Sequence, residues 1–272
     1  MASKKTGTKK VKRILNVIPS KNTDQEWSMK TAVGAGMLAA PAALPASKDL
    51  REAWWKVGDQ GSTGSCVGWG TAEGVLRWHF VKTNQIQQDA NSSPSLSPRF
   101  IWMAAKETDD DVTRPTTFIE SDGTSLKSAL DIARKFGVVK DSVLPFSSGA
   151  LYQGDENTFY AIASQLKIAA YINLQKDVSQ WRTWLAATGP ILAALNVDKT
   201  WDDATLNSGN MDVFQPNTVR GGHCISIVGY RADGRFIVRN SWGTTWGDKG
   251  FGYATESYIQ AAFFPEAYGV NL

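Results

Sequence analysis

A cysteine lies within a glycine-rich stretch, GDQGSTGSCVGWG at residues 58–70, which holds five glycines in thirteen residues. This residue, Cys66, is one of only two cysteines in the chain, and the sequence that begins with it, CVGWGTAEGVLRWHFVK, predicts a helix. A helix N-terminus stabilises a thiolate through its unpaired N–H groups and its dipole. The glycines allow the backbone to pass close to a bound molecule. The pattern therefore indicates a nucleophilic thiol, which needs a base beside it.

Only two histidines, His79 and His223, could serve as that base. His79 follows Cys66 by thirteen residues on the same predicted helix. That spacing corresponds to a rise of about 20 Å. We therefore expect His79 to be a packed or surface histidine with no catalytic role.

His223 begins a strand-like stretch, GGHCISIVGY, which is followed by the turn residues RADG and a second strand, RFIVRN. A hairpin that closes over residues 231–234 would place Asn240 opposite Ile225. His223 would then lie one same-face step from Asn240, about 7–8 Å away between backbones. An asparagine oxygen at that distance can hold the imidazole N–H and fix its tautomer.

The stretches GDQGSTGSCVGWG, GGHCISIVGY and NSWGTTWGDKGFGY together resemble the papain-like cysteine peptidases, with Cys, His and Asn in the same order. NSWGTTWGDKG is the most specific of the three. The resemblance covers about residues 45–272. It implies an α+β fold of two lobes. The N-terminal lobe would be helical and carry the nucleophile helix, and the C-terminal lobe would be rich in β-strands. The active site would lie in the cleft between them.

The resemblance also implies a role for each matching residue. Cys66 would be the nucleophile, His223 its general base and acid, and Asn240 the residue that orients His223. Gln60 and the backbone N–H of Cys66 would form the oxyanion hole. Trp242 would shield the hydrogen bond between His223 and Asn240 and border the leaving-group side. The implied reaction is hydrolysis of a peptide or protein substrate through a thioester, with no cofactor or metal.

Two glycines are expected to contact the substrate: Gly64 in the glycine-rich loop, and Gly123 in SDGTS, which resembles the family's glycine stretch that pairs with the substrate backbone.

Thr63 stands where a disulfide cysteine is usual in the family. This departure fits a bacterial- or intracellular-type member without disulfides. Cys224 alternates within a strand and is expected to be an inert buried thiol.

The elements that must position these residues divide the chain in two. Residues 97–106 and 125–136 predict further helices, whereas short strand-like stretches follow after about residue 165. We expect a leader at 1–13, a linker or short pro-segment at 14–47, and a peptidase domain at 48–272. Within that domain, the helical lobe would span about 48–155 and the β-rich lobe about 156–272.

The net charge of +3 depends on the first thirteen residues, which carry six basic side chains and no acid, so the remainder carries +3 − 6 = −3. We interpret this leader as solvated and disordered, with no nucleic acid required.

The sequence has no apolar run long enough to span a membrane. It also lacks a standard signal peptide, which favours a cytoplasmic protein or one exported by another route.

Other chemistries fit these residues less well. GSCVG matches a nucleophile elbow, but that motif follows an apolar strand, and WWKVGDQGST is a polar loop. A zinc site would need His223 and Cys224, whose side chains point to opposite faces of a strand.

Two functional alternatives stay open: a catalytically inactive papain-like binding module, and an enzyme that transfers the acyl group to an amine. The chain could also be a zymogen in which residues 14–47 occupy the cleft and inhibit it.

Overall fold

The computed structural model describes residues 12–39, 43–91, 94–108, 122–147 and 152–272. Most of the predicted leader, residues 1–11, lies outside these ranges. The helices are α1 (Met29–Gly34), α2 (Cys66–Thr71), α3 (Arg77–Lys82), α4 (Pro98–Thr108), α5 (Leu126–Lys135), α6 (Glu156–Ala163), α7 (Val178–Ala187), α8 (Lys199–Asp203) and α9 (Glu256–Ala262). The strands are β1 (Lys48–Asp49), β2 (Ala170–Asn173), β3 (Ile191–Asn196), β4 (Asn210–Met211), β5 (Gly222–Tyr230), β6 (Phe236–Arg239), β7 (Phe251–Ala254) and β8 (Phe263–Asn271).

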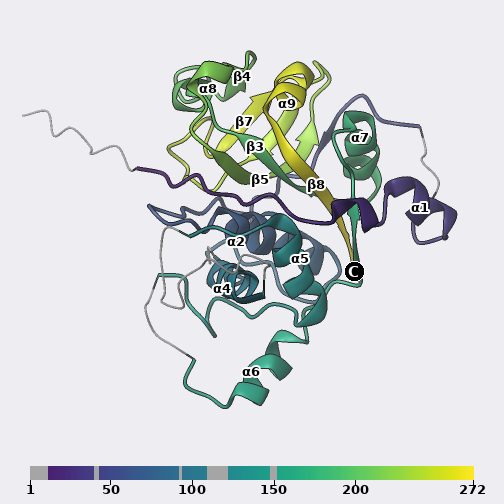
Figure 1. Ribbon diagram of the computed structural model, residues 1–272, viewed down its shortest axis with the longest axis vertical. Helices are drawn as coiled ribbons and strands as arrows, with labels where there is room; N and C mark the ends of the chain where they lie inside the picture. The colour runs from purple at the N-terminus through teal and green to yellow at the C-terminus, as the bar shows by residue number, and fades with distance from the viewer. Residues whose placement is uncertain (1–11, 40–42, 92–93, 109–121, 148–151) are drawn as a thin grey trace, which may run out of the picture.

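Helix α2 lies between two layers, with the sheet on one side and α4 and α5 on the other (Figure 1). It continues through a π-helical turn, Ala72–Leu76, into α3, so that helical structure runs from residue 66 to residue 82 as the sequence predicts. Every residue of α2 and of the π-helical turn is buried. The helices predicted at 97–106 and 125–136 are confirmed as α4 and α5.

Glycines allow α2 and the π-helical turn to approach the sheet closely. A Cβ atom on Gly70 would lie 2.7 Å from the Cys224 sulfur, and one on Gly74 would lie 1.9 Å from the Ser226 hydroxyl. Both partners belong to β5, all nine residues of which are buried. The nucleophile helix and the strand that carries His223 are therefore packed directly against each other.

The sheet has the strand order β2-β8-β3-β5-β6-β7-β4, and β1 pairs with the far end of β5. Its pairs are antiparallel except for β4 with β7. Ser226 pairs with Arg239, which is the register in which Asn240 follows opposite Ile225. The predicted hairpin is thus confirmed near His223.

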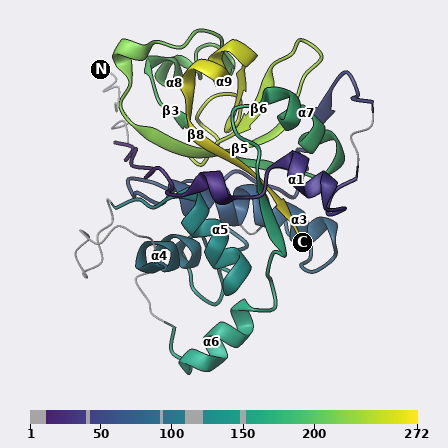
Figure 2. The ribbon, with the colours of Figure 1, turned by 45° about the vertical axis from the view of Figure 1, so that its right-hand side comes forward.

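The C-terminal half contains more helix than its strand-like stretches indicate. Helices α7, α8 and α9 pack around the sheet (Figure 2), and the long strand β8 completes it. Residues 156–163, which the sequence assigns to the β-rich lobe, form α6 instead. The Phe159 ring of α6 lies 5.5 Å from that of Phe100 in α4, so α6 belongs with the helical lobe.

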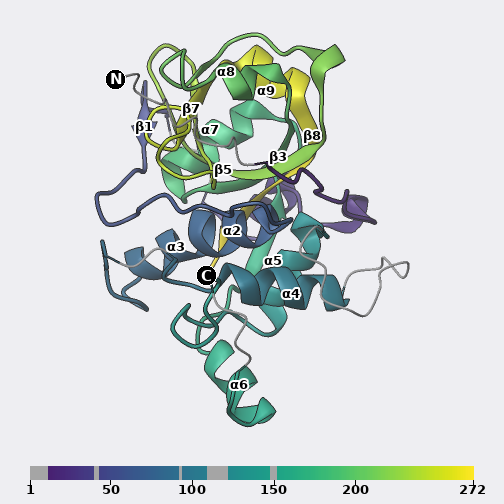
Figure 3. The same cartoon turned by 90° about the vertical axis from the view of Figure 1, so that its left-hand side faces the viewer.

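Figure 3 shows the two lobes, with the sheet above α2 and the remaining helices of the first lobe beside and below it. This arrangement confirms the predicted α+β, papain-like fold class. None of the helices in the described part of the chain is long and apolar enough to cross a membrane.

A buried ion pair ties the nucleophile helix to its own lobe. The Arg77 guanidinium donates to the Glu73 carboxylate at 2.8 Å, and both side chains are almost fully buried. Glu73 also accepts hydrogen bonds from the backbone N–H groups of Ser95 and Leu96. Arg77 donates to the backbone carbonyl oxygen of Trp54. The pair therefore holds two loops against the helix that begins at the nucleophile.

Replacing Arg77 by leucine should lower the free energy of unfolding by about 3 kcal/mol, because it leaves the Glu73 charge buried without its counter-ion. Lys82→Ala is the control, since Lys82 pairs with Glu52 in an exposed ion pair. Such pairs contribute about 1 kcal/mol or less. Urea denaturation measures both changes. Equal stability of the two variants would contradict the structural role given to the buried pair.

Candidate active site

Cys66 is the first residue of α2 and has no exposed surface. Backbone N–H groups that include those of Val67, at the helix N-terminus, and of Cys224 in β5 lie close enough to the sulfur to lower the pKa of its thiol. Cys224 directly follows His223, so the thiol lies against the part of the strand that carries the histidine. The fold therefore places Cys66, at the start of a helix of one lobe, against the strand of the other lobe that carries His223.

His223 is held by Asn240, which follows β6. The distance from His223 Nε2 to Asn240 Oδ1 is 2.8 Å, and the same oxygen accepts the backbone N–H of Ser241 at 2.8 Å. Because an amide oxygen can only accept, Nε2 carries the proton and Nδ1 is left as the basic nitrogen. Nδ1 is buried and has no hydrogen-bond partner among the described residues. It is therefore the nitrogen that can take a thiol proton.

Aromatic rings enclose this histidine. The Trp242 ring centroid lies 4.8 Å from that of His223, and the Trp201 ring meets the imidazole edge-on at 5.6 Å. Trp201, in α8, also stacks on Trp246 at 5.4 Å. The sequence motif contains Trp242 and Trp246, but no spacing pattern indicates Trp201. Only the packing of α8 on the sheet brings it to the imidazole.

Gln60 is fixed beside Asn240 by the pairing of two loops. Its backbone N–H donates to the Ser241 carbonyl oxygen at 2.8 Å, and its Oε1 accepts from the Ser241 hydroxyl at 2.8 Å. Its Nε2 donates one hydrogen to the Thr63 carbonyl oxygen at 2.9 Å, which leaves the second hydrogen for another acceptor. The buried carboxamide is thus held in one orientation close to the catalytic pair.

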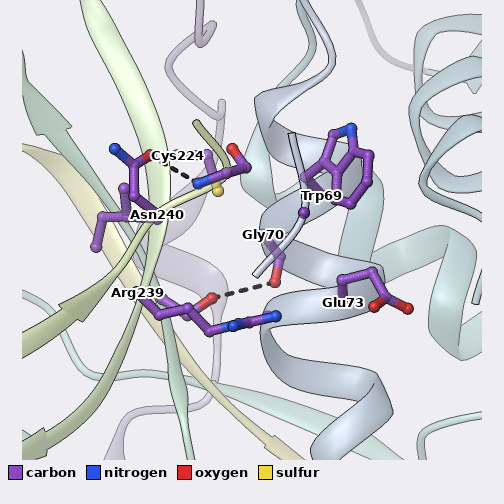
Figure 4. Close-up of a pocket in the computed structure, with 11 residues that line it drawn as sticks. Trp69, Gly70, Glu73, Cys224, Arg239 and Asn240 are labelled. Carbon is purple, nitrogen blue, oxygen red and sulfur yellow. Dashed lines mark hydrogen bonds between the residues drawn. The ribbon is translucent and has the colours of Figure 1, made fainter. Parts of the chain in front are cut away.

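The space beneath these residues is closed by side chains from both lobes. Figure 4 shows Cys224, Arg239 and Asn240 on the sheet side, facing Trp69, Gly70 and Glu73 on the helical side. The pocket between them has a volume of only about 10 Å³. Within the described ranges, no three His, Cys, Asp or Glu side chains are grouped so that they could hold a metal ion.

The N-terminal segment, residues 12–22, crosses between the lobes above this site (Figures 1 and 2). Two backbone N–H groups of the segment donate hydrogen bonds: Val17 to the Gly222 carbonyl oxygen (3.3 Å) and Ile18 to the Thr124 carbonyl oxygen (3.1 Å). Two of its carbonyl oxygens lie close to glycines, that of Leu15 to Gly221 and that of Asn16 to Gly123. A Cβ atom on Gly123 would lie 1.9 Å from the Asn16 oxygen. The segment therefore lies in the cleft as an extended chain.

Arg13 begins this crossing and is held at several points, although the sequence places it in a solvated leader. It forms an ion pair with Asp59, and its guanidinium lies over the Trp242 ring at 5.7 Å. Only 15% of its side chain is exposed. The ion pair of Arg13 with Asp59 was missed in the sequence analysis. The positive charge of Arg13 does not distinguish it from the nearby lysines, and the ion pair forms only in the folded chain.

Burial keeps Cys66 and His223 uncharged. Burial raises the pKa of the Cys66 thiol to about 11, and the backbone N–H groups around the sulfur offset this only in part. Burial lowers the pKa of His223 to about 4, a change that Asn240 opposes and the Arg13 charge reinforces. At neutral pH the covered site therefore holds a thiol and a neutral imidazole.

The remaining predicted residues are placed as follows. Gly64 is buried just before the nucleophile, and Gly123 lies against the N-terminal segment. His79 is buried in α3 away from this site, against Trp78, as expected from its helical spacing. Cys224 is buried as predicted, and burial raises its pKa well above the usual value, so it is a poor nucleophile.

Comparison with known proteins gives consistent matches. A family profile described as papain family cysteine protease matches residues 44–261. Cathepsin B-like CP3 of Giardia intestinalis is 27% identical over 236 residues, which cover 82% of this chain and 72% of that protein. The cathepsin L-like proteinase of Fasciola hepatica is 27% identical over 218 residues, which cover 77% of this chain but only 60% of that protein.

Solved structures share the fold over nearly the whole chain. Xylellain, a cysteine protease from Xylella fastidiosa, superposes with a TM-score of 0.73 at 23% identity, and the match covers 98% of this chain and 99% of xylellain. The procathepsin B S9 of Trypanosoma congolense gives a TM-score of 0.68 at 15% identity, over 95% of this chain and 86% of that structure.

The covered site should make Cys66 unreactive at neutral pH. In a Cys224→Ser chain, the rate of Cys66 alkylation by iodoacetamide should be low at pH 7 and rise as the pH approaches the raised pKa of the thiol, because only the thiolate reacts. The adduct is measured by intact mass, with Cys66→Ala as the blank. A fast rate that is flat from pH 5 to pH 8 would contradict this, since it would require a thiolate and an imidazolium already formed.

Proposed function

This chain belongs to the papain family of cysteine proteases, and we propose that it cleaves peptide bonds with Cys66 as nucleophile and His223 as general base and acid. The observation that carries the assignment is the 2.8 Å hydrogen bond between His223 Nε2 and Asn240 Oδ1, with the Cys66 thiol near the backbone N–H of the residue that follows His223. This arrangement fixes the tautomer that leaves Nδ1 free to deprotonate the thiol.

The chemistry follows from the geometry. Proton transfer from Cys66 to His223 gives a thiolate, which attacks the carbonyl carbon of the peptide bond. The second Nε2 hydrogen of Gln60 and the backbone N–H of Cys66 are the donors for the oxyanion that forms. His223 then protonates the leaving amine, and water hydrolyses the thioester.

The retained residues favour this function over an inactive binding module. A binding module needs neither an oriented imidazole nor a fixed oxyanion donor, and the chain has both. Acyl transfer to an amine would use the same site and the same thioester. Product analysis in the presence of an added amine separates transfer from hydrolysis.

An epoxide probe for cysteine peptidases tests the assignment directly. In a chain whose N-terminal segment is released, as in the Val17→Pro variant described below, the probe should modify Cys66 alone, and adding Cys66→Ala should abolish both modification and peptide cleavage. Gln60→Ala should lower kcat by about a hundredfold, the usual cost of one oxyanion donor. Gln180→Ala, which removes an amide far from the cleft, should leave kcat unchanged. Equal modification of Cys66 and Cys224, without peptide cleavage, would instead support the inactive module.

We also propose that the N-terminal segment inhibits the enzyme. It hydrogen-bonds to Gly222, next to the catalytic histidine, and to Thr124, next to the proposed substrate-binding Gly123. The catalytic residues beneath it have no exposed surface. The residues involved, 13–20, overlap the start of the expected inhibitory segment at 14–47. The later helix α1 lies beyond the cleft, near β2 (Figure 2).

The direction of the segment explains how it can occupy the cleft without being cleaved. A substrate would place its acyl part at Gly123 and its leaving amine at Trp242. The segment has Arg13 at Trp242 and Asn16 at Gly123, so its chain runs in the opposite direction. Its peptide groups therefore do not present their carbonyl carbons to Cys66 as a substrate does.

Val17→Pro should release this inhibition, because proline lacks the N–H that donates to Gly222. We expect Cys66 to react with the epoxide probe about tenfold faster in this variant than in the unchanged chain. Val17→Ala, which keeps the N–H, controls for loss of the side chain and should give a smaller increase. An unchanged labelling rate in Val17→Pro would show that the segment does not limit access to the site.

A further inference from the structure

The Arg13 side chain occupies a site built entirely from residues outside the N-terminal segment. Its guanidinium donates to both carboxylate oxygens of Asp59, to the Gly61 carbonyl oxygen at 2.8 Å, and to the Trp242 carbonyl oxygen at 3.1 Å. The Trp242 ring lies under the guanidinium carbon at 5.7 Å. A carboxylate, two carbonyl oxygens and an aromatic ring thus converge on one cation.

The acceptors match arginine better than lysine. A guanidinium presents five N–H donors in a planar fork, whereas an ammonium is a compact point charge with three donors. Here the two terminal nitrogens share the Asp59 carboxylate, and each also reaches a separate carbonyl oxygen. This fork-shaped arrangement on an aromatic face is the recognition pattern of arginine.

The site is held in place independently of Arg13. Asp59 and Trp242 form an antiparallel bridge, and the Gly243 N–H donates to the Gly58 carbonyl oxygen at 2.9 Å. The Asp59 carboxylate also accepts the Gly61 N–H at 2.8 Å. These contacts lie within the body of the enzyme, so the acceptors keep their arrangement when the N-terminal segment leaves the cleft.

The location of the site relates it to the proposed reaction. The Trp242 ring borders His223 at 4.8 Å, and His223 is the group that would protonate the leaving amine. Asp59 directly precedes Gln60, the proposed oxyanion donor. Arg13 is also close enough to lower the pKa of His223. A residue just after the scissile bond would therefore extend towards Asp59.

We infer that Asp59, with the carbonyl oxygens of Gly61 and Trp242, forms a binding site for an arginine side chain on the leaving-group side of the scissile bond. This inference rests on the proposed peptidase function and extends it to a substrate class: peptides with arginine at the first or second position after the cleaved bond. The enzyme's own Arg13 occupies the same site in the covered form.

Capture of the acyl-enzyme by amines tests this site separately from the rest of the substrate. The full-length chain carries Arg13→Gln, which empties the site, and Val17→Pro, which is expected to release the N-terminal segment. It is given a small ester substrate, which forms the Cys66 thioester. An added amine then attacks the thioester carbonyl. The C–N bond forms, the C–S bond breaks, sulfur leaves as a thiolate, and the amine proton passes to His223. The ratio of amide to acid product, measured by mass spectrometry, reports binding of the amine on the leaving-group side.

The amines are argininamide and glycyl-argininamide, which place the guanidinium at the first and second positions. Each is compared with its citrulline counterpart, which has the same shape without the charge. We expect one of the two arginine amines to be captured about tenfold better than its citrulline counterpart. Introducing Asp59→Asn should reduce that preference to less than twofold.

Asp212→Asn is the matched control. Asp212 also pairs with an arginine, Arg235, and its side chain is 51% exposed, compared with 49% for Asp59. This variant should retain the full preference for arginine. A preference that survives Asp59→Asn, or that Asp212→Asn removes equally, would overturn the assignment to Asp59.

The remaining outcomes separate this site from the proposed function. Ester hydrolysis with equal capture of the arginine and citrulline amines at both lengths would overturn the arginine site and leave the peptidase function standing. Failure to hydrolyse the ester at all would overturn the proposed function, and this site with it.

Discussion

The active site depends on a short backbone pairing between two loops that are distant in the sequence. Residues 58–60 pair with residues 241–243, through Gln60 N–H to the Ser241 carbonyl oxygen and Gly243 N–H to the Gly58 carbonyl oxygen. This pairing joins the loop before the nucleophile helix to the loop after the strand that follows His223. It places Gln60 beside Asn240, and Asp59 beside Trp242. The proposed oxyanion donor and the proposed arginine site both depend on it, and it lies next to the asparagine that orients His223.

The second constraint is the close packing of α2 on β5. Gly70 and Gly74 let the helix lie directly on the strand. A side chain at either position would collide with Cys224 or Ser226. Cys66 therefore reaches the strand beside His223. The ion pair of Glu73 and Arg77 anchors the same helix to the loops of its own lobe. The catalytic pair is thus formed across an interface that is fixed from both sides.

Burial sets the charge state of Cys66 and His223, and the Arg13 charge adds to its effect on His223. Low polarity disfavours both the thiolate and the imidazolium, so burial shifts the two pKa values in the directions that keep the pair neutral. Under the proposed inhibition, release of the segment would admit water and remove the Arg13 charge, and both changes would favour the ion pair. The same segment would thus exclude the substrate and favour the uncharged state of Cys66 and His223.

The sequence by itself determined the chemistry and much of the local structure. Motif order and the presence of only two histidines selected Cys66 and His223. The hairpin around RADG correctly placed Asn240 near the imidazole, although a register shift between Ile227 and Tyr230 separates the turn from His223. The helices α4 and α5 followed from local periodicity and stop signals, because such signals act within a few residues.

Only the tertiary structure decided the surroundings of the site. Trp201 at the imidazole, α6 in the helical lobe, and Arg13 in an acidic site with Asp59 all arise from contacts between residues far apart in the chain. The raised pKa of Cys66 has the same origin, since it reflects complete burial of a thiol that the fold packs between elements distant in the sequence. A local pattern carries no record of such contacts, because they depend on which surfaces the complete fold brings together.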